Sequence, residues 1–272
     1  MGEIEKTKKL YGLLWDKDKN IPVDKWHFNK MQEVIPEPIV RGRVGIEIGS
    51  GCGYDTYIMA KGNPFVKIIS LEISDGVYKS RKLTCALENV RVINGSASSI
   101  PAKDNIFDFA YSFGVLHHTP DPLRCLKEIA RIIKKDAAVY LYLYEDHSEN
   151  QAKHLVLIMV KLLRKITTRM PPKILYVISF LASPFIAIIF SYPSRFFKHF
   201  KITHPLSERM PFNFGTHPFS LTGDLYDRFG APIEHRFDKD EVYNMFIECG
   251  FCGVFITRLR DSAGWVVRGY KQ

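Results

Sequence analysis

The chain has 272 residues, of which 46% are hydrophobic and 25% are charged, a composition typical of one large soluble domain with a sizeable core. These proportions exclude a disordered, collagen-like or coiled-coil protein. The five cysteines are scattered and predict no disulfide framework, so we expect a reducing compartment. The first ten residues, MGEIEKTKKL, have neither an apolar signal core nor the Ser or Thr of a myristoylation site, so we expect a cytoplasmic protein.

The excess positive charge of the chain lies in one segment. There are 38 Lys and Arg against 29 Asp and Glu, which gives a formal net charge of +9. The segment from Gln151 to Leu206 contains no Asp or Glu, and its basic residues are Lys153, Lys161, Arg164, Lys165, Arg169, Lys173, Arg195, Lys198 and Lys201. These nine residues account for the whole excess, so the rest of the chain is neutral. Because the same segment is also the most apolar, the chain consists of two parts of different composition.

The first half of the chain alternates between strand and helix patterns. Residues 1–42 mix charged and aromatic side chains and predict two short helices, the second capped by Asp24 and ended by Pro36. Asp121-Pro122 supplies an N-cap and a proline at the first helical position. Strands are predicted at 44–48, 66–73, 90–94, 106–113 and 137–144, and helices at 54–61, 74–88 and 122–136. Such alternation is typical of a parallel sheet with helices on both faces.

The pattern breaks after Glu145 and resumes at Asp238. There Asp238 and Glu241 form a capping box, and the helix that they begin runs to Gly250. Strands at 251–257 and 263–270 predict an antiparallel hairpin. We therefore predict an α/β fold with a Rossmann-like seven-stranded sheet, made of five parallel strands and the C-terminal antiparallel hairpin. The predicted divisions are an N-terminal helical lid (1–42), a core (43–147), a helical insertion (148–237) and the completion of the core (238–272).

A glycine-rich loop follows the first predicted strand. In the segment from Glu47 to Gly53, EIGSGCG, three glycines at alternate positions allow a tight turn and the close approach of a ligand to a helix N-terminus. A tight turn without a ligand is the alternative. Glu72 lies 21 residues after Gly51, at the end of the second strand, where a carboxylate can accept hydrogen bonds from both ribose hydroxyls. NAD is disfavoured because Tyr54 replaces the third glycine of its motif and no second nucleotide-binding half follows.

Four segments together resemble a known family. They are EIGSGCG, LEIS, NGSASSIPAKDNIFDFAYSFGVLHHTPDP and LKEIARIIKK. They are similar to the class I S-adenosylmethionine-dependent methyltransferases, in the branch of the ubiquinone/menaquinone and related small-molecule methyltransferases (methyltransferase type 11). The resemblance covers about 44–145 and 238–270. It implies methyltransferase activity with S-adenosyl-L-methionine as cofactor and S-adenosylhomocysteine as product.

The resemblance also implies a cofactor site. Glu47 is expected near the methionine part, the glycines along the cofactor, and Glu72 on the ribose. Relatives commonly carry Asp for the adenine amino group where this chain has Ser96, so here the Ser96 hydroxyl and the backbone N–H of Ala97 take that place. The expected cofactor-binding residues are Glu47, Gly49, Ser50, Gly51, Gly53, Glu72, Ile73, Ser96, Ala97 and Phe113.

Methyl transfer requires alignment of the acceptor and, for some acceptors, removal of a proton. His117 and His118 follow the fourth strand at the carboxyl edge, where open α/β sheets bind ligands, and His117 is the candidate catalytic base. The alternative is that one histidine bonds the loop backbone and the other is exposed. Candidate substrate contacts are Tyr11, His118, His235 and Arg236, for which a packing helix or solvent-facing loops are the alternatives. No metal requirement is expected.

The pair Cys249 and Cys252 forms a C-x-x-C motif. A redox pair has its first cysteine at a helix N-terminus, which lowers the thiol pKa, whereas Cys249 is predicted at a helix C-terminus. A zinc site needs a second pair of ligands, and none is nearby. We therefore expect two buried structural thiols.

The insertion has a membrane-like pattern. From Ala152 to Thr168, Lys153, Lys161, Arg164, Lys165 and Thr168 form one helical stripe opposite an apolar side, as in a basic amphipathic helix on an anionic membrane. The segment from Ile174 to Tyr192 has nineteen residues without a charge, enough to span a bilayer. Both flanks must join the same sheet, so we predict a monotopic arrangement. Pro184 predicts two short helical legs, in plane or as a re-entrant hairpin.

Two interpretations of the insertion stay open. In the first, the helices form a buried lid over the substrate pocket, which explains their apolarity but not their nine positive charges. In the second, the helices face lipid and also roof a pocket, which explains the apolarity and the charges. RNA binding is disfavoured because the charges rim apolar runs instead of lining a polar groove. We thus expect a methyltransferase for a lipophilic or lipid-linked small molecule, attached to the anionic inner membrane face through 152–201. The alternatives are an enzyme for a soluble glycan or natural product and a non-catalytic cofactor-binding protein.

Overall fold

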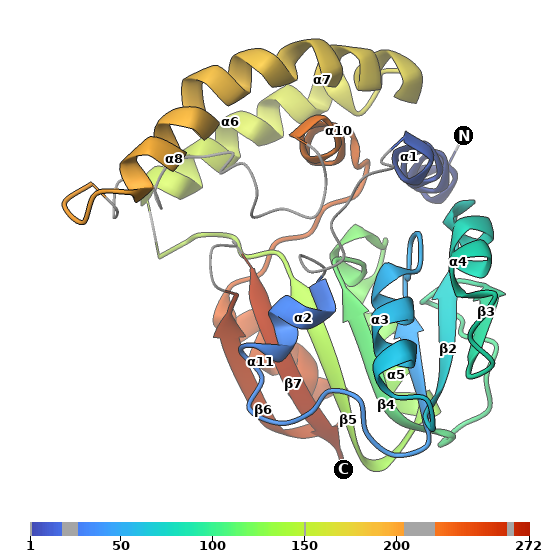
Figure 1. The fold of residues 1–272 in the computed structure, drawn as a ribbon. Coiled ribbons are helices and arrows are strands. Elements are labelled where there is room, and N and C mark those ends of the chain that lie inside the picture. Colours follow the sequence, from blue (N-terminus) through green and yellow to red (C-terminus); the bar gives the residue numbers. More distant parts are fainter. Residues whose placement is uncertain (1, 18–26, 150, 204–220, 260–263) are drawn as a thin grey trace.

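The structure is a computed structural model that describes residues 2–17, 27–149, 151–203, 221–259 and 264–272. Its centre is a seven-stranded sheet in the order β3-β2-β1-β4-β5-β7-β6 (Figure 1). The strands are β1 (Val44–Ile48), β2 (Lys67–Glu72), β3 (Val90–Asn94), β4 (Phe107–Phe113), β5 (Ile133–Leu143), β6 (Phe251–Arg258) and β7 (Trp265–Lys271). Strands β1 to β5 pair in parallel, and β7 is antiparallel to both β5 and β6. The predicted fold class is confirmed.

Alternation along the strands divides the core into two parts, one on each face of the sheet. On one face, Ile46 and Ile48 of β1 pack with residues of α5 (Pro122–Ile132) and α11 (Lys239–Glu248). On the other face, Phe109 and Tyr111 of β4 pack with residues of α2 (His27–Gln32) and α3 (Tyr54–Gly62). Helices therefore cover both faces, as the strand–helix alternation predicted.

The helix starts that were predicted from capping residues occur in the structure. The Asp121 side chain accepts a hydrogen bond from the Arg124 N–H at 2.9 Å, with Pro122 following the cap. Asp238 and Glu241 form the predicted capping box, with bonds of 2.7 and 2.9 Å. Helix α4 (Gly76–Thr84) ends before the predicted residue 88. The Asp24 cap lies outside the described residues.

A layer of helices lies across the carboxyl edge of the sheet (Figure 1). It consists of α1 (Glu3–Lys17), α6 (Gln151–Thr167), α7 (Pro172–Ile186), a π-helical turn (Ala187–Ser191), α8 (Tyr192–Lys198) and α10 (Leu221–Gly230). Helix α10 contacts α1, α6 and α7. The layer has its own small core of Leu10, Leu14, Leu175 and Tyr226. The N-terminal helix and the insertion therefore pack together above the sheet.

The expected break at Pro184 is wrong, because Pro184 lies inside one continuous helical rod from α7 through α8. Proline has no N–H for the carbonyl oxygen of Phe180, one turn earlier. The Ser183 hydroxyl donates to that oxygen at 2.9 Å and replaces the missing bond. The π-helical turn then continues the rod. The rod spans Pro172–Lys198, 27 residues, and is long and apolar enough to cross a membrane by length and composition alone.

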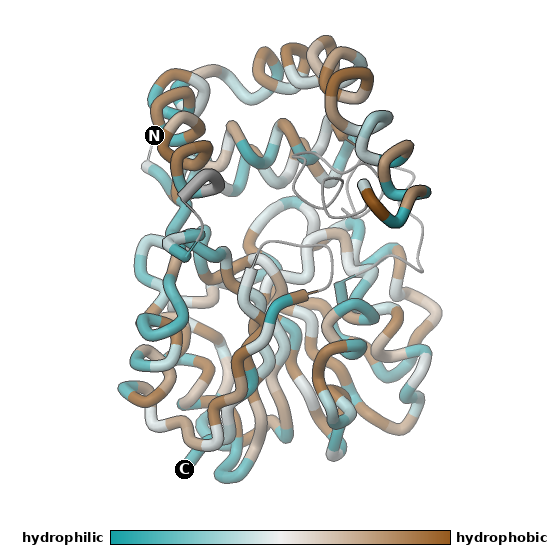
Figure 2. Tube along the Cα trace, turned by 90° about the vertical axis from the view of Figure 1, so that its left-hand side faces the viewer, coloured by the Kyte–Doolittle hydropathy of each residue, from teal (hydrophilic) through white to brown (hydrophobic). Residues whose placement is uncertain are grey.

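The insertion exposes a wide apolar surface, which we call the outer apolar face. Figure 2 shows runs of hydrophobic residues along the helices of this layer. In the most apolar stretch of the rod only 17% of the residues are buried. The exposed side chains of the outer apolar face are Leu155, Val156, Ile158, Met159, Leu162, Leu163 and Ile166 of α6, and Ile174, Val177, Ile178, Phe180, Leu181, Phe185, Ile188, Ile189 and Phe196 of the rod. This surface is far larger than the single exposed hydrophobic residues that soluble proteins carry.

Arg164 does not belong to an exposed basic stripe, which corrects the expectation for α6. Its side chain is only 9% exposed and forms an ion pair with Glu234 at 2.7 Å. It also donates to the carbonyl oxygens of Arg228 and Ala231 at the end of α10, at 2.5 and 2.6 Å. The planar guanidinium can serve several acceptors at once, so it turns inward. Lys161 and Lys165 remain exposed.

We predict that Arg164→Gln lowers the free energy of unfolding by about 3 kcal/mol, because it leaves the carbonyl oxygens of Arg228 and Ala231 without their charged donor and removes one of the two arginines that pair with Glu234. The matched variant Lys165→Gln changes an exposed side chain and is expected to shift stability by no more than about 0.5 kcal/mol. Urea unfolding followed by circular dichroism measures both. Equal stabilities of the two variants would contradict the buried position of Arg164.

Candidate functional site

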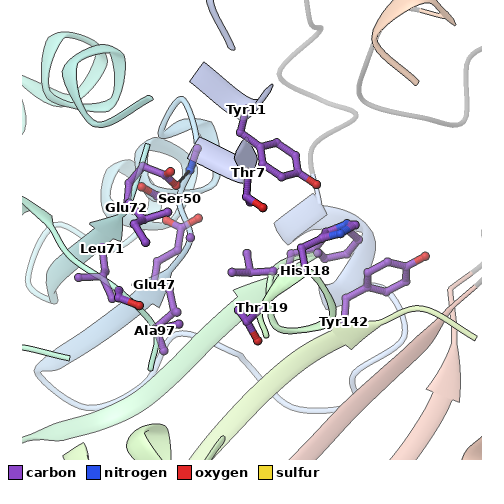
Figure 3. Close-up of a pocket in the computed structure, with 18 of the residues that line it drawn as sticks. Thr7, Tyr11, Glu47, Ser50, Leu71, Glu72, Ala97, His118, Thr119 and Tyr142 are labelled. Atoms are coloured by element: carbon purple, nitrogen blue, oxygen red, sulfur yellow. Dashed lines mark hydrogen bonds between the residues drawn. The ribbon is translucent and has the colours of Figure 1, made fainter. Parts of the chain in front are cut away.

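A cavity of about 340 Å³ opens at the carboxyl ends of β1, β2, β4 and β5, beneath α1 and α10. The cavity brings together most of the residues that the sequence pointed to. Those that line it are Tyr11, Glu47, Gly49, Ser50, Gly51, Glu72, Ile73, Ser96, Ala97, Phe113 and His118. Gly53, His117, His235 and Arg236 do not line it. Figure 3 shows two sides, with Glu47, Ser50, Leu71, Glu72 and Ala97 on one and Tyr11, His118, Thr119 and Tyr142 on the other.

The first side, which we call the loop half, is built by the glycine loop and Glu72. The Glu72 carboxylate accepts backbone N–H bonds from Gly51 and Ser74, both at 2.7 Å. Each carboxylate oxygen keeps a free lone pair for a ligand. Gly51 has a φ of +55°, and a Cβ there would collide with the ring of Trp15. The loop therefore needs glycine at this position, and α1 packs directly on it.

One buried polar atom in the loop half has no partner among the residues that the structure describes. This atom is the hydroxyl oxygen of Ser50, a residue that lines the cavity. Buried hydroxyl groups nearly always form a hydrogen bond, so this hydroxyl is a candidate contact for a polar group of a ligand. Gly53 serves a different purpose, because a Cβ at that position would meet the backbone of Ser80 in α4.

The floor of the loop half carries two buried carboxyl groups. Burial raises the pKa of Glu47 well above its ordinary value, and the nearby Asp55 raises it further. The Thr56 hydroxyl donates to Glu47, while Asp55 accepts from the Phe28 N–H at 3.1 Å and the Tyr111 hydroxyl at 3.0 Å. A cationic ligand group above this floor would favour the charged form of Glu47. The loop half is thus suited to a ligand with a positive charge.

The second side, which we call the aromatic half, joins α1, the fourth and fifth strands, and the insertion. It is defined by the cavity-lining residues Tyr11, His118, Tyr142, Tyr144, Asp227, Ile233 and Leu259. Phe113, which also lines the cavity, stacks between His27 and Tyr142, with ring centroids 4.0 and 4.2 Å apart. These rings give this half mostly apolar walls.

His118 has one defined tautomer when it is neutral. Its Nδ1 lies 2.8 Å from the carbonyl oxygen of Ile233, which can only accept a hydrogen bond. The proton therefore lies on Nδ1, and Nε2 keeps a lone pair. Near its ring, the Tyr11 hydroxyl donates to Asp227 at 2.8 Å, and the Tyr144 hydroxyl does so at 3.4 Å. The aromatic half thus contains one proton acceptor and one carboxylate.

His117, expected as the catalytic base, lies behind the cavity wall. Its ring is fully buried and stacks on Tyr144, with centroids 3.8 Å apart. Neither ring nitrogen has a hydrogen-bond partner among the described residues. Burial, together with the nearby His118 and Arg236, holds the pKa of His117 well below its ordinary value. These surroundings favour a neutral packing residue.

The other two expected substrate contacts also lie outside the cavity. The His235 N–H donates to the carbonyl oxygen of His117 at 2.8 Å. Arg236 pairs with Glu234 at 2.7 Å, and its guanidinium lies 5.0 Å from the centroid of the Tyr144 ring. His235 therefore supports the backbone of His117 behind the wall, and Arg236 lies against the ring of Tyr144 in the wall.

Several lining residues were not anticipated from the sequence. Tyr142 lies near the end of β5 and Tyr144 directly follows that strand, where the alternation of side chains places residues two apart on the same side. That periodicity was available in the sequence. Asp227 and Ile233 belong to the insertion, where no motif distinguishes them, so only the folded structure shows that they face the cavity.

The remaining chemical features of the sequence lie away from the cavity. Cys249 and Cys252 are free and half-buried, which corrects the expectation of full burial. Burial raises the pKa of Cys249 to about 11. In the part of the chain that the structure describes, no group of three or more His, Cys, Asp or Glu side chains is arranged to hold a metal ion.

Comparison with known proteins adds the following likenesses. Residues 46–141 match the family model described as the methyltransferase domain. Demethylmenaquinone methyltransferase of Staphylococcus aureus (strain JH9) is 29% identical over 129 residues, which are 46% of this chain and 53% of that protein. The chain thus spans about half the length of the curated relatives it matches.

Solved structures show a similar fold. A SAM-dependent methyltransferase of Thermotoga maritima, described as a possible histamine N-methyltransferase, gives a TM-score of 0.50 at 18% identity and covers 99% of this chain and 95% of that chain. A chain of the complex between the Haloferax volcanii Trm112 methyltransferase activator and a methyltransferase gives 0.57 at 14% identity, over 97% and 96% of the two chains. At these identities the likeness shows the fold alone.

We predict that His117 makes stability depend on pH. An unfolded histidine binds a proton below about pH 6.5, whereas the folded His117 does not, because its pKa lies well below that value. The unfolded state then binds more protons, so the free energy of unfolding falls as the pH falls, by about 2 kcal/mol at pH 5. His117→Phe is expected to abolish this part of the pH dependence in urea unfolding between pH 7 and pH 5. His199→Phe, at an exposed position, is the control that keeps it; the same dependence in both variants would contradict the prediction.

Proposed function

We propose that this chain, which contains a class I S-adenosylmethionine-dependent methyltransferase domain, methylates a lipophilic or lipid-linked small molecule at the inner membrane face. The match over 46–141 confirms the family that the glycine loop and its following segments predicted. The observation that carries the activity is the unpartnered Ser50 hydroxyl in a cavity between the glycine loop and an aromatic half that contains His118. The cavity thus provides for a cofactor and an acceptor together.

The loop half fits the cofactor of this family. The free lone pairs of Glu72 suit two ribose hydroxyls, the Ser50 hydroxyl suits a polar group of the methionine part, and Ser96 and Ala97 lie on the side expected for adenine. When bound, S-adenosylmethionine supplies a methyl carbon activated by its sulfonium charge. The acidic floor of Glu47 and Asp55 favours such a cationic ligand.

The aromatic half performs the remaining tasks. Its rings exclude water, and α1 and the insertion close it from above as a roof. His118 receives the acceptor proton on Nε2, because Nδ1 already carries a proton bonded to Ile233. The bound cofactor would supply the methyl carbon to the acceptor atom and keep the electron pair of the carbon–sulfur bond on its own sulfur, so no further reactant would be needed.

The membrane location rests on the outer apolar face. Exposed apolar helices flanked by Lys161 and Lys165 are the pattern of a protein that lies in the interface of an anionic bilayer. Core strands precede and follow the insertion, so a single crossing by the rod Pro172–Lys198 is disfavoured, and we propose an in-plane position. A relative named for demethylmenaquinone supports a lipophilic acceptor.

A soluble acceptor, with the insertion as a lid, is the second candidate. Asp227 and Ile233 of the insertion line the cavity, so the insertion contributes to the pocket under either interpretation. The outer apolar face distinguishes them, because a lid that covers only a pocket has no need for an exposed apolar surface.

We predict that S-adenosylhomocysteine binds the purified protein. Glu72→Ala is expected to weaken this binding at least about tenfold, because the ligand loses a charged hydrogen-bond acceptor and the glycine loop loses the carboxylate that holds it. Glu248→Ala removes an exposed glutamate of α11 and serves as the matched control. Isothermal titration calorimetry measures all three proteins. Absence of binding to the wild type would refute the methyltransferase proposal and favour a domain that has kept the fold alone.

We predict that the double variant Lys161→Glu/Lys165→Glu reduces binding to phosphatidylglycerol vesicles at least about tenfold, since each surface lysine contributes about 1 kcal/mol. Lys67→Glu/Lys135→Glu reverses two exposed lysines at the amino-terminal ends of β2 and β5, on the opposite edge of the sheet, and leaves vesicle binding unchanged. Vesicle co-sedimentation measures both. Wild-type protein that stays in the supernatant would favour the soluble acceptor.

A further inference from the structure

We propose that Asp227 is the anchor for the acceptor in the aromatic half and that it selects a neutral hydrogen-bond donor, a hydroxyl or phenol, over an anionic group. The inference rests on the proposed function, because it names the substrate class of that same site. Asp227 lines the cavity, yet only 5% of the residue is exposed. Burying a carboxylate lowers the stability of the folded protein unless the carboxylate accepts hydrogen bonds.

The hydrogen bonds that Asp227 accepts from the described residues leave room for at least one more donor. Tyr11 of α1 donates to Oδ1 at 2.8 Å, and Tyr144 donates to Oδ2 at 3.4 Å. Two carboxylate oxygens have about four lone-pair sites. The bond from Tyr144 is long, so Oδ2 is the weakly satisfied oxygen. A hydroxyl group that enters the cavity can therefore complete the set of bonds around Asp227.

Asp227 is held firmly from behind. The carbonyl oxygens of the next residue, Arg228, and of Ala231 both accept bonds from Arg164, and the Thr167 hydroxyl donates to Phe229 at 2.6 Å. Helix α6 thus fixes the end of α10. A rigid carboxylate discriminates between ligands better than a mobile one, because it cannot swing away from an unfavourable group.

The negative charge of Asp227 distinguishes between anionic, apolar and neutral hydrogen-bonding acceptors. Of the seven residues that define the aromatic half, Asp227 is the one with a formal charge, and it is negative. A carboxylate or phosphate on the acceptor would meet a like charge between mostly apolar walls. A purely apolar acceptor would leave Oδ2 with one long bond. A neutral donor satisfies the oxygen without repulsion.

The anchor also lies beside the proposed proton acceptor. The ring centroids of Tyr11 and His118 are 5.7 Å apart, and those of His118 and Tyr144 are 5.4 Å apart. Both tyrosines that bond Asp227 therefore flank His118. A hydroxyl-bearing acceptor bound at Asp227 lies in the same half of the cavity as Nε2 of His118. Asp227 thus acts by binding, and His118 by accepting the proton.

Lys30 of α2 also lines the cavity and would favour an anionic acceptor. The experiment therefore compares four probes of one shape with S-adenosylhomocysteine at saturation. These are 2-naphthol, 2-naphthoate, 2-methylnaphthalene and 2-naphthylmethylammonium, titrated calorimetrically at pH 7. We expect 2-naphthol to bind at least about tenfold tighter than 2-naphthoate. Tighter binding of 2-naphthoate or of the ammonium probe would overturn the assignment, the latter in favour of an amine acceptor.

Two variants test the residue itself. Asp227→Asn keeps the size and removes the charge, so the preference for 2-naphthol over 2-naphthoate is expected to fall to about threefold or less. Tyr11→Phe removes the donor to Oδ1 and keeps the carboxylate, so 2-naphthol, which is proposed to donate to Oδ2, is expected to bind no more weakly than to the wild type. The proposal would be overturned if Asp227→Asn kept the wild-type preference for 2-naphthol over 2-naphthoate. It would also be overturned if Tyr11→Phe lost this preference while Asp227→Asn kept it.

Binding of S-adenosylhomocysteine is measured separately for each protein. If the wild type does not bind it, the proposed function fails; if the wild type binds it but ranks the probes differently, only the role of Asp227 fails. Should Asp227→Asn not fold, the probe order in the wild type decides the question by itself.

Discussion

The pairing of β5 with β7 is the constraint on which the rest of the structure depends. Leu143 at the end of β5 lies opposite Trp265 of β7, although the whole insertion, α11 and β6 separate them in the chain. Glu145, just before the insertion, and Phe237, its last residue, form a parallel bridge, so the insertion leaves and rejoins the sheet on one side, at its carboxyl edge. That is where parallel strands leave ligand sites open. The position of the roof over the cavity follows from this pairing, and so does the argument against a single membrane crossing.

The basic residues of α6 have two roles: the arginine forms buried contacts, and the lysines remain on the surface. Arg164 turns inward, where its planar guanidinium serves Glu234 and two carbonyl oxygens at once. Lys161 and Lys165 stay exposed beside the outer apolar face. The same helix thus holds α10 in place on one side and presents apolar and basic groups on the other. A net charge alone does not separate these roles.

Burial divides the histidines in a similar way. His117 and His118 are adjacent in the chain, but only His118 lines the cavity and has a backbone partner that sets its tautomer. His117 lies on the other side of Tyr144 with its pKa held well below the ordinary value by burial. The loop half and the aromatic half therefore differ in chemistry as well as in position, with Glu47 and Asp55 beneath one and His118 and Asp227 in the other.

The sequence by itself determined the features that depend on local patterns. The strand–helix alternation, the caps at Asp121 and Asp238, and the glycine loop with Glu72 follow from periodicity and backbone chemistry over a few residues, and the structure contains them all. The continuation of the helix through Pro184 also rests on a local bond, from the hydroxyl of Ser183 to the carbonyl oxygen of Phe180. Only the tertiary structure decided that Arg164 is buried and that Asp227 faces the cavity. The physical reason is that both side chains depend on partners that are distant in the sequence: the end of α10 for Arg164, and a tyrosine more than two hundred residues away for Asp227.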